Sequence, residues 1–283
     1  MNKLTDGYKL SNGYSIPCVG FGTFLTPEDE VVESVKAALK AGYRHIDGAA
    51  VYGNEKGVGK GIKESGVARE EIFVTSKVWN AERGYEKTKA AFQKTLDDLG
   101  LEYLDLYLIH WPANRRQFGD AAADLNAQTW RAMEDLYLEG KIKSIGVSNF
   151  WPHHLEELMK TARIKPMVNQ IEYHPGWMQH AVVSYCEVHN ILVEAWSPLG
   201  RSNVLKNETV KAVAAAYGKS EAQICIRWAL QHGILPLPKS VTPERIQQNA
   251  EVFDFEISAE DMQKIDNIYD CGMHYELPDE VDF

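Results

Sequence analysis

The stretch Leu104-Asp-Leu-Tyr-Leu-Ile109 decides the fold class, because it is a short apolar run that ends directly at a histidine, His110. Further runs of the same kind recur along the chain. They are Val19–Phe21, Tyr43–Ile46, Ile72–Ser76, Ser144–Val147, Met167–Ile171, Ile191–Ala195 and Ile234–Leu237. Most of these runs are apolar on both faces, which is typical of parallel strands covered by helices.

Amphipathic helices are predicted between these strands. In the first, Thr26 is the expected N-cap, Pro27 takes the first helical position and Gly42 ends the helix. Two motifs, Ser220-x-x-Gln223 and Ser258-x-x-Asp261, resemble capping boxes that begin later helices. The apolar spacing predicts further helices over Glu86–Leu99, Asn126–Leu138, Pro152–Thr161, Met178–Val188 and Glu221–Gln231.

Eight strand–helix units in 283 residues predict an α/β fold of the (β/α)8 TIM-barrel type, for which about 250 residues is typical. An open doubly wound sheet is the alternative. We favour the barrel because no Gly-x-Gly-x-x-Gly motif follows a strand and no linker divides the chain, so residues 1–283 are expected to form one domain. Tyr8–Leu10 and Tyr14–Ile16, around Asn12-Gly13, predict an N-terminal β-hairpin over the barrel bottom, and Gly272–Phe283 a short C-terminal tail.

Composition excludes several classes of function. The net charge of −10 argues against nucleic-acid binding, which needs many lysines and arginines against phosphates. The apolar runs are far shorter than the roughly 20 residues of a membrane span, and no signal peptide is visible. The four cysteines and nine histidines lack the spacing of a zinc site or a disulfide framework, so we expect reduced thiols, a cytoplasmic protein and no metal.

Polar side chains end several of the predicted strands. Asp47, Lys77 and His110 each come directly after an apolar run, and Tyr52 lies on the loop after Asp47. In a barrel of this type the active site lies at the carboxyl ends of the strands, so these four groups are expected to converge. A free tyrosine, with a pKa near 10, is a poor proton donor at neutral pH, and a buried ammonium beside it would favour the tyrosinate.

Each of these residues also has an ordinary structural interpretation, such as a solvated lysine or a histidine satisfied in the core. Their convergence favours an acid–base unit in which Asp47 keeps Lys77 charged. Aromatic residues after strand ends are consistent with an apolar pocket for a small molecule. These aromatic residues are Phe24, Trp79, Trp111 and Phe118.

On these residues the chain resembles the aldo-keto reductases, in particular the prokaryotic branch that includes 2,5-diketo-D-gluconate reductases. The resemblance runs from about Val19 to Asn249 and more weakly to the C-terminus. Its motifs are Gly20-Phe-Gly-Thr23, His45-Ile-Asp-Gly-Ala-Ala-Val-Tyr-Gly-Asn-Glu55, Thr75-Ser-Lys-Val-Trp79, Asp105-Leu-Tyr-Leu-Ile-His-Trp-Pro112, Gly146-Val-Ser-Asn-Phe150, Asn169-Gln-Ile-Glu-Tyr-His174 and Leu237-Pro-Lys-Ser240, followed by Arg245 and Asn249.

The resemblance implies reduction of aldehydes and ketones by NADPH, with a catalytic tetrad of Asp47, Tyr52, Lys77 and His110. Tyr52 would donate the proton, Lys77 would lower its pKa and pair with Asp47, and His110 would orient the carbonyl. The resemblance also implies the binding residues. For the cofactor they are Gly22, Thr23, Asp47, Ser148, Asn149, Gln170, Trp196, Ser197, Leu199, Asn203, Lys239, Ser240, Val241, Arg245, Gln248 and Asn249; for the substrate they are Phe24, Val51, Tyr52, Trp79, His110 and Trp111.

Within the resemblance, Ser148, Asn149 and Gln170 would bind the nicotinamide carboxamide, and the ring would stack on Trp196. The pyrophosphate would run along Ser197 to Asn203. Lys239, Ser240 and Arg245 would hold the adenosine 2′-phosphate, and Thr242-Pro243 resembles a helix start, which is a good phosphate site. Gln248 and Asn249 would face the adenine.

The chain departs from the family pattern at Gly48, Phe24 and Gln248, where Thr or Cys, Trp and Glu are frequent. The loop Ala113–Asp124 and the tail are short, so we expect a small and open pocket. Two alternatives remain, a non-catalytic NADPH-sensing or structural relative and a Schiff-base aldolase that uses Lys77. A monomer is the usual form in the family, and the physiological carbonyl is not named by the sequence.

Overall fold

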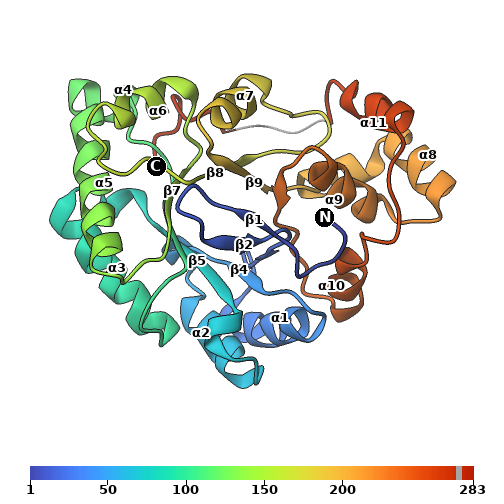
Figure 1. The fold of residues 1–283 in the computed structure, drawn as a ribbon, viewed down its shortest axis with the longest axis horizontal. Helices are drawn as coiled ribbons and strands as arrows, with labels where there is room; N and C mark the ends of the chain where they lie inside the picture. Colours follow the sequence, from blue (N-terminus) through green and yellow to red (C-terminus); the bar gives the residue numbers. More distant parts are fainter. Residues whose placement is uncertain (272–275) are drawn as a thin grey trace.

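The structure is a computed structural model that describes residues 1–271 and 276–283. Eight parallel strands form one sheet in which each strand is hydrogen-bonded to the next along the chain. The strands are β3 (Phe21–Gly22), β4 (His45–Asp47), β5 (Phe73–Val78), β6 (Leu106–Ile109), β7 (Ile145–Ser148), β8 (Val168–Glu172), β9 (Leu192–Trp196) and β10 (Leu235–Pro236). Figure 1 shows the helices on the outside of these strands.

Two backbone hydrogen bonds close the sheet into a barrel. The Gly20 amide donates to the Pro236 carbonyl and the Gly22 amide to the Pro238 carbonyl, both at 3.0 Å. These bonds join the chain segments at the first and last strands, so the open doubly wound sheet is excluded. The predicted (β/α)8 barrel is confirmed, and its strands are buried on both faces as the apolar runs predicted.

Each strand begins one or two residues later than its apolar run indicated, and most strands also end one or two residues later. The run Tyr43–Ile46 becomes β4, which ends at Asp47, and the run Ile72–Ser76 becomes β5, which contains Lys77. Asp47 and Lys77 are therefore part of their strands, whereas His110 follows β6. The Asp47 and Lys77 side chains are both buried, and Lys77 Nζ donates to Asp47.

Helices surround the barrel. They are α1 (Glu28–Lys40), α2 (Glu55–Glu64), α3 (Tyr85–Leu99), α4 (Arg115–Phe118), α5 (Ala122–Leu138), α6 (Pro152–Met159), α7 (His180–Val188), α8 (Glu208–Tyr217), α9 (Glu221–Gln231), α10 (Pro243–Ala250) and α11 (Ala259–Asp266). The prediction for α9 is confirmed at both ends, including the reciprocal capping box of Ser220 and Gln223. No helix in the described ranges has the length and apolar character needed to cross a membrane.

The capping predicted for two helices differs in the structure. Thr26 is not the N-cap of α1, because Pro27 has extended backbone angles and its carbonyl accepts from Glu30 and Val31. At α11 the Ser258 hydroxyl accepts from the Asp261 amide, as a capping box requires. The Asp261 carboxylate, however, accepts from the Ser258 hydroxyl and not from the Ser258 amide. The Tyr217 hydroxyl accepts from the Ser258 amide instead, so only half of the box forms.

The N-terminal hairpin is confirmed as β1 (Gly7–Lys9) paired antiparallel with β2 (Ser15–Pro17). The Tyr14 hydroxyl donates to Asp105 at 2.8 Å and the Asn12 amide to the Lys143 carbonyl at 2.9 Å. Both acceptors precede strands, so the hairpin lies at the amino ends of the barrel, in front of the strands in Figure 1. The opposite end is left open for the site.

Helix α2 was not predicted, because three glycines at alternate positions weaken the helical pattern. These glycines allow close packing. A Cβ on Gly57 would come within 2.4 Å of Val31 on α1, and a Cβ on Gly59 within 1.9 Å of the Leu99 carbonyl at the end of α3. The backbone of α2 therefore approaches its neighbours more closely than any larger residue permits.

We expect Gly59→Ala to lower the free energy of unfolding by about 1–3 kcal/mol, because the new methyl group has no space and the backbone it meets must move. Urea denaturation measures this loss. Gly48→Ala is the matched control, since a Cβ there would lie 3.6 Å from its nearest neighbours. Equal stability of the two variants would show that α2 does not depend on this close approach.

Candidate active site

Four predicted residues converge at the carboxyl end of the barrel. Asp47 ends β4, Lys77 lies within β5, His110 follows β6, and Tyr52 ends a 3₁₀ turn, Ala50–Tyr52. Lys77 is fully buried, and its Nζ donates to Asp47 Oδ1 at 2.7 Å and to the Gly48 carbonyl at 2.8 Å. The Tyr52 hydroxyl lies 3.5 Å from the same Nζ. The Tyr52 and His110 rings meet edge to face with centroids 5.8 Å apart.

The buried ion pair sets the charges of these groups. Burial alone would lower the pKa of the Lys77 ammonium, but Asp47, with smaller contributions from Tyr52 and Glu194, reverses this effect and the pKa is raised. Burial, together with the charge of Lys77, holds the pKa of His110 well below its usual value. At neutral pH Lys77 is therefore charged and His110 is neutral.

The pKa of Tyr52 differs from the prediction. Burial raises this pKa, the Lys77 ammonium acts against the rise, and the net direction is upward. The expected influence of Lys77 is present, but the cost of placing a tyrosinate in the barrel mouth exceeds it. The hydroxyl consequently holds its proton at neutral pH.

A second acidic side chain, Glu194, is buried near Asp47. The Gln170 Nε2 donates both to Asp47 Oδ2, at 2.9 Å, and to Glu194 Oε2, at 2.8 Å. Glu194 was missed by the sequence analysis, although a charged residue inside the apolar run Ile191–Ala195 is the signal that could have found it.

The residues predicted around the nicotinamide form one hydrogen-bonded group. The Ser148 hydroxyl donates to the Gln170 carbonyl at 2.7 Å, and the Asn149 amide donates to the His110 carbonyl at 3.0 Å. The Trp196 indole donates to Asn149 Oδ1 at 2.8 Å and remains partly exposed. This group adjoins the four converging residues through His110.

Backbone strain is concentrated in the segments predicted to bind the cofactor. Asn149, Ser197, Arg201 and Ser202 have positive φ angles of 63°, 49°, 46° and 70°. Residues other than glycine rarely adopt this conformation, and it persists where surrounding structure enforces it, often at functional sites. Leu199 and Asn203 lie in the same segment and are half-buried.

The residues predicted at the adenosine end lie around the start of α10. Thr242 is its N-cap, Pro243 takes the first position, and the Ser240 hydroxyl accepts from the Thr242 amide at 3.1 Å. Val241, Arg245 and Gln248 are exposed, whereas Asn249 is buried. Arg245 forms no ion pair within the described ranges, so its guanidinium is available to an anion.

Gly22 and Thr23 connect the adenosine end to the tetrad. A Cβ on Gly22 would lie 3.3 Å from the Leu237 carbonyl and 3.7 Å from the Lys239 Cβ. The Thr23 hydroxyl donates to the Asp47 carbonyl at 2.9 Å. The Lys239 Nζ reaches the Leu25 carbonyl at 3.4 Å. Gly22, Thr23 and Lys239 thus link Asp47 to the segment that leads into α10.

Aromatic side chains form the wall predicted for the substrate. The Phe24 and Tyr52 ring centroids are 5.0 Å apart, and those of Trp79 and His110 are 5.2 Å apart. Trp111 is buried, while Phe24 and Val51 are exposed at the rim. Phe118 packs instead against Arg83, whose guanidinium carbon lies 5.3 Å from the centroid of the Phe118 ring. Phe118 therefore lies beside this wall and is not part of it.

The C-terminal tail covers one side of the mouth. Phe283 stacks on Trp79 with centroids 5.7 Å apart and meets Trp111 edge to face. The buried Asn114 amide donates to the Pro278 and Val281 carbonyls, both at 2.9 Å. The expectation of an open pocket is therefore wrong on this side, and Phe283 is a rim residue that no periodicity in the tail indicated. Residues 272–275 of the predicted tail lie outside the described residues.

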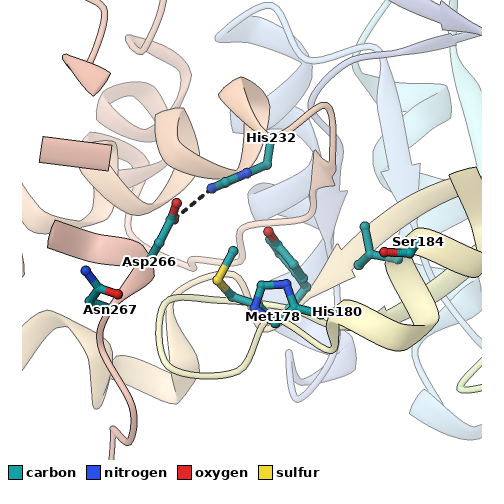
Figure 2. A pocket seen from close by; sticks show the side chains of 8 residues that line it. Met178, His180, Ser184, His232, Asp266 and Asn267 are labelled. Atoms are coloured by element: carbon teal, nitrogen blue, oxygen red, sulfur yellow. Dashed lines mark hydrogen bonds and ion pairs between the residues drawn. The ribbon is translucent and has the colours of Figure 1, made fainter. Parts of the chain in front are cut away.

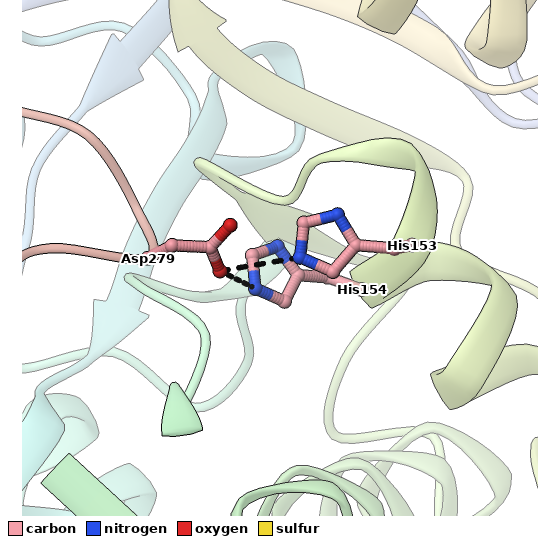
Figure 3. A group of neighbouring side chains, drawn as sticks. All are labelled: His153, His154 and Asp279. Atoms are coloured by element: carbon pink, nitrogen blue, oxygen red, sulfur yellow. Dashed lines mark hydrogen bonds and ion pairs between the residues drawn. The ribbon is translucent and has the colours of Figure 1, made fainter. Parts of the chain in front are cut away.

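Asp279 fixes the tail to α6. Figure 3 shows the imidazoles of His153 and His154 pointing toward its carboxylate, with Nε2–Oδ1 distances of 3.2 Å and 2.9 Å. Three possible metal ligands thus meet in one place. However, His154 Nδ1 accepts from the Trp151 amide, so the proton of the neutral ring is on Nε2 and faces Asp279. Because a ligating nitrogen must be deprotonated, this arrangement favours a clamp on the tail.

A pocket of about 350 Å³ lies outside the barrel, between α7, the end of α9 at His232 and the end of α11 at Asp266 (Figure 2). Asp266 there accepts from His232 and from the Trp228 indole, at 2.8 Å and 2.7 Å. None of the predicted site residues lines it. Its polar groups tie α11 to α9, and the predicted chemistry lies at the barrel mouth.

A charged lysine beside a tyrosine and a neutral histidine, at the carboxyl end of a closed barrel, is the arrangement that the sequence motifs predicted. The chain belongs to the aldo/keto reductase family, whose model matches residues 18–270. The family membership predicted from the motifs is thereby confirmed, as is the prediction of an NADP(H)-dependent oxidoreductase.

Individual relatives agree over nearly the whole chain. The chain is 54% identical over 281 residues to a glyoxal reductase of Bacillus subtilis, which covers 99% of both chains. The crystal structure of MGS-M4, an aldo-keto reductase from a Medee basin deep-sea metagenome library, matches with a TM-score of 0.91 and 47% identity over 98% of this chain and all of that one. The crystal structure of a Bombyx mori aldo-keto reductase in complex with NADP matches with a TM-score of 0.86 and 38% identity, and the match covers 93% of this chain and 92% of that one.

We expect Asp279→Ala to free the tail, because the carboxylate that both histidines contact is lost. Hydrogen exchange of residues 276–283 should become faster. Asp282→Ala is the control, since Asp282 lies on the same tail but forms only an exposed pair with Arg116 at 3.9 Å. If both variants exchange at the same rate as the unchanged protein, the clamp does not hold the tail.

Proposed function

We propose that this protein reduces aldehydes and ketones to alcohols with NADPH, and that Asp47, Tyr52, Lys77 and His110 carry the chemistry. The observation that supports this most is the buried Lys77–Asp47 pair with the Tyr52 hydroxyl 3.5 Å from Lys77 Nζ. A proton donor with a fixed cation behind it suits a carbonyl oxygen that gains negative charge during reduction.

Tyr52 would donate the proton to the carbonyl oxygen. Its raised pKa keeps the hydroxyl protonated until the oxygen becomes basic. The Lys77 ammonium would then stabilise the tyrosinate that the transfer leaves. Asp47 would keep Lys77 charged through this step, because a neutral amine could not stabilise the phenolate.

His110 would orient the substrate. Its ring is neutral because burial and Lys77 lower its pKa, so it can donate a hydrogen bond to the carbonyl oxygen without adding a second positive charge. The Trp79 and Tyr52 rings on either side restrict how the imidazole turns. The carbonyl oxygen would thus lie between the Tyr52 hydroxyl and His110.

NADPH, when bound, supplies the hydride that the carbonyl carbon accepts. Ser148, Asn149 and Gln170 would hold its carboxamide and Trp196 its ring. Ser197, Leu199 and Asn203 would lie along the pyrophosphate, in the strained segment that already has a defined shape. Lys239, Ser240 and Arg245 would bind the 2′-phosphate at the start of α10, with Gln248 and Asn249 near the adenine.

The substrate would be a small carbonyl compound. The wall of Phe24, Trp79, Trp111 and the tail residue Phe283 offers aromatic surface to such a compound. An α-oxo aldehyde of the glyoxal type would suit this mouth, and a relative that is 54% identical is named a glyoxal reductase. Other small aldehydes, α-keto compounds and open keto-sugars belong to the same chemical class.

The alternatives have less support. A Schiff-base lysine must be neutral, whereas Asp47 raises the pKa of Lys77. A non-catalytic NADPH-sensing role gives no reason for a buried ion pair directed at a tyrosine. We also propose that the protein works as a one-domain monomer, the form expected from the family resemblance, and that it works in the cytoplasm, which suits four free cysteines.

We expect Tyr52→Phe to lower kcat by about 10² or more, because the phenyl ring cannot donate the proton. Consumption of NADPH with a reactive aldehyde measures this, and quenching of protein fluorescence should report unchanged NADPH affinity. Tyr269→Phe is the control, since Tyr269 is 95% exposed. Full turnover without the Tyr52 hydroxyl would assign the proton to another group.

We expect Arg245→Ala to raise the KM for NADPH about tenfold and to change the KM for NADH by less than about twofold, because only NADPH carries the 2′-phosphate. Arg131→Ala, at an exposed arginine of α5, serves as the control for loss of surface charge. An unchanged ratio of the two KM values would place the phosphate elsewhere.

A further inference from the structure

Glu194 is a fully buried carboxyl group inside the barrel, and the proposed chemistry leaves it without a role. It lies on β9, opposite Gln170 of β8 and Leu235 of β10 in the strand register. Side chains alternate along a strand, so Glu194 points to the same side as Trp196, two residues later. It therefore lies below Trp196 and level with Gln170.

The Gln170 side chain connects Glu194 to the tetrad. An amide nitrogen carries two hydrogens, and here both are used, one by Asp47 Oδ2 at 2.9 Å and one by Glu194 Oε2 at 2.8 Å. The acceptor of the amide, Gln170 Oε1, is left for another donor. The main-chain carbonyl of Gln170 accepts from the Ser148 hydroxyl and from the main-chain N–H of Asn149.

We propose that Glu194 is a positioning residue for the cofactor, which together with Asp47 fixes the Gln170 amide so that Oε1 is presented to the N–H groups of the nicotinamide carboxamide. This inference rests on the proposed function, because it takes NADPH as the ligand. Asp47 alone would hold one N–H and leave the amide free to turn about its last torsion, which is soft. Two acceptors on one nitrogen fix the amide plane before the ligand arrives.

The charge of Glu194 is consistent with this role. Burial, with a contribution from Asp47, raises the pKa of Glu194 to about 8, against the effects of the Gln170 hydrogen bond and Lys77. His45 of β4 faces it, with Nε2 3.9 Å from Glu194 Oε1, and burial with Lys77 lowers the pKa of that imidazole to about 3. Both groups are therefore neutral at pH 7, and Glu194 does not compete with Asp47 for Lys77.

The test compares two ligands that share the adenosine end. NADPH carries the nicotinamide, whereas adenosine 2′,5′-bisphosphate does not. We expect Glu194→Leu, which removes the acceptor and keeps the volume, to weaken NADPH binding about tenfold and to leave the affinity for the bisphosphate unchanged. Glu194→Gln keeps an acceptor oxygen and should restore NADPH affinity to within about twofold of the unchanged protein. Titration calorimetry measures all these affinities.

The coupling through Gln170 is tested in a second background. In Gln170→Ala the amide is absent, so adding Glu194→Leu should cause no further loss of NADPH affinity. Three results would overturn the proposal: equal NADPH affinity of Glu194→Leu and the unchanged protein, equal losses for NADPH and the bisphosphate, or additive losses in the double variant. If Glu194→Leu does not fold, Glu194→Ala enters the same comparison.

Failure of the proposed function is seen separately. If the unchanged protein binds NADPH but none of the aldehydes tested causes NADPH to be oxidised, the reductase assignment fails. The affinity comparison still decides the role of Glu194 in that case. If turnover is normal and the Glu194 variants bind both ligands as before, the reductase assignment stands and the positioning role is lost.

Discussion

The site depends on one ion pair, Lys77 with Asp47, buried where the strands end. A lysine without exposed surface keeps its charge only when a carboxylate lies against it, and here the Gly48 carbonyl accepts a further hydrogen. The pair then determines its surroundings: His110 stays neutral, Tyr52 lies beside a fixed cation, and Gln170 is drawn toward Asp47. Removing either charge would leave the other unpaired in the barrel.

The barrel brings the two members of this pair together from neighbouring strands, β4 and β5. Asp47 and Lys77 are 30 residues apart in sequence and belong to adjacent strands, while Gln170 lies on the opposite part of the ring. The hairpin lies at the amino ends of the strands, and the tail covers one side of the carboxyl ends. Asn149 and Ser197, which have positive φ angles, lie beside this mouth. Each comes directly after a strand, β7 or β9, which holds its left-handed backbone conformation in place.

The alternation of apolar runs and helical periods was sufficient to predict eight strands, the barrel and the convergence of four polar residues. Periodicity could not predict α2, since Gly57, Gly59 and Gly61 serve contacts with α1 and α3 instead of helix propensity. The position of the tail could not be predicted either, because it is held by contacts of Asn114 and Asp279 with residues far away in the sequence. Glu194 was overlooked since its significance lies in a partner on β8, and the net pKa of Tyr52 depends on burial that no linear pattern contains.

The closure of the barrel has a consequence for how the chain is made. The bonds that complete the ring join Gly20 and Gly22 to Pro236 and Pro238, more than 200 residues later. Until the last strand emerges from the ribosome, the sheet has two open edges with unpaired amides and carbonyls, which are templates for pairing with other chains. Synthesis of this protein therefore passes through an interval in which protection by chaperones matters most.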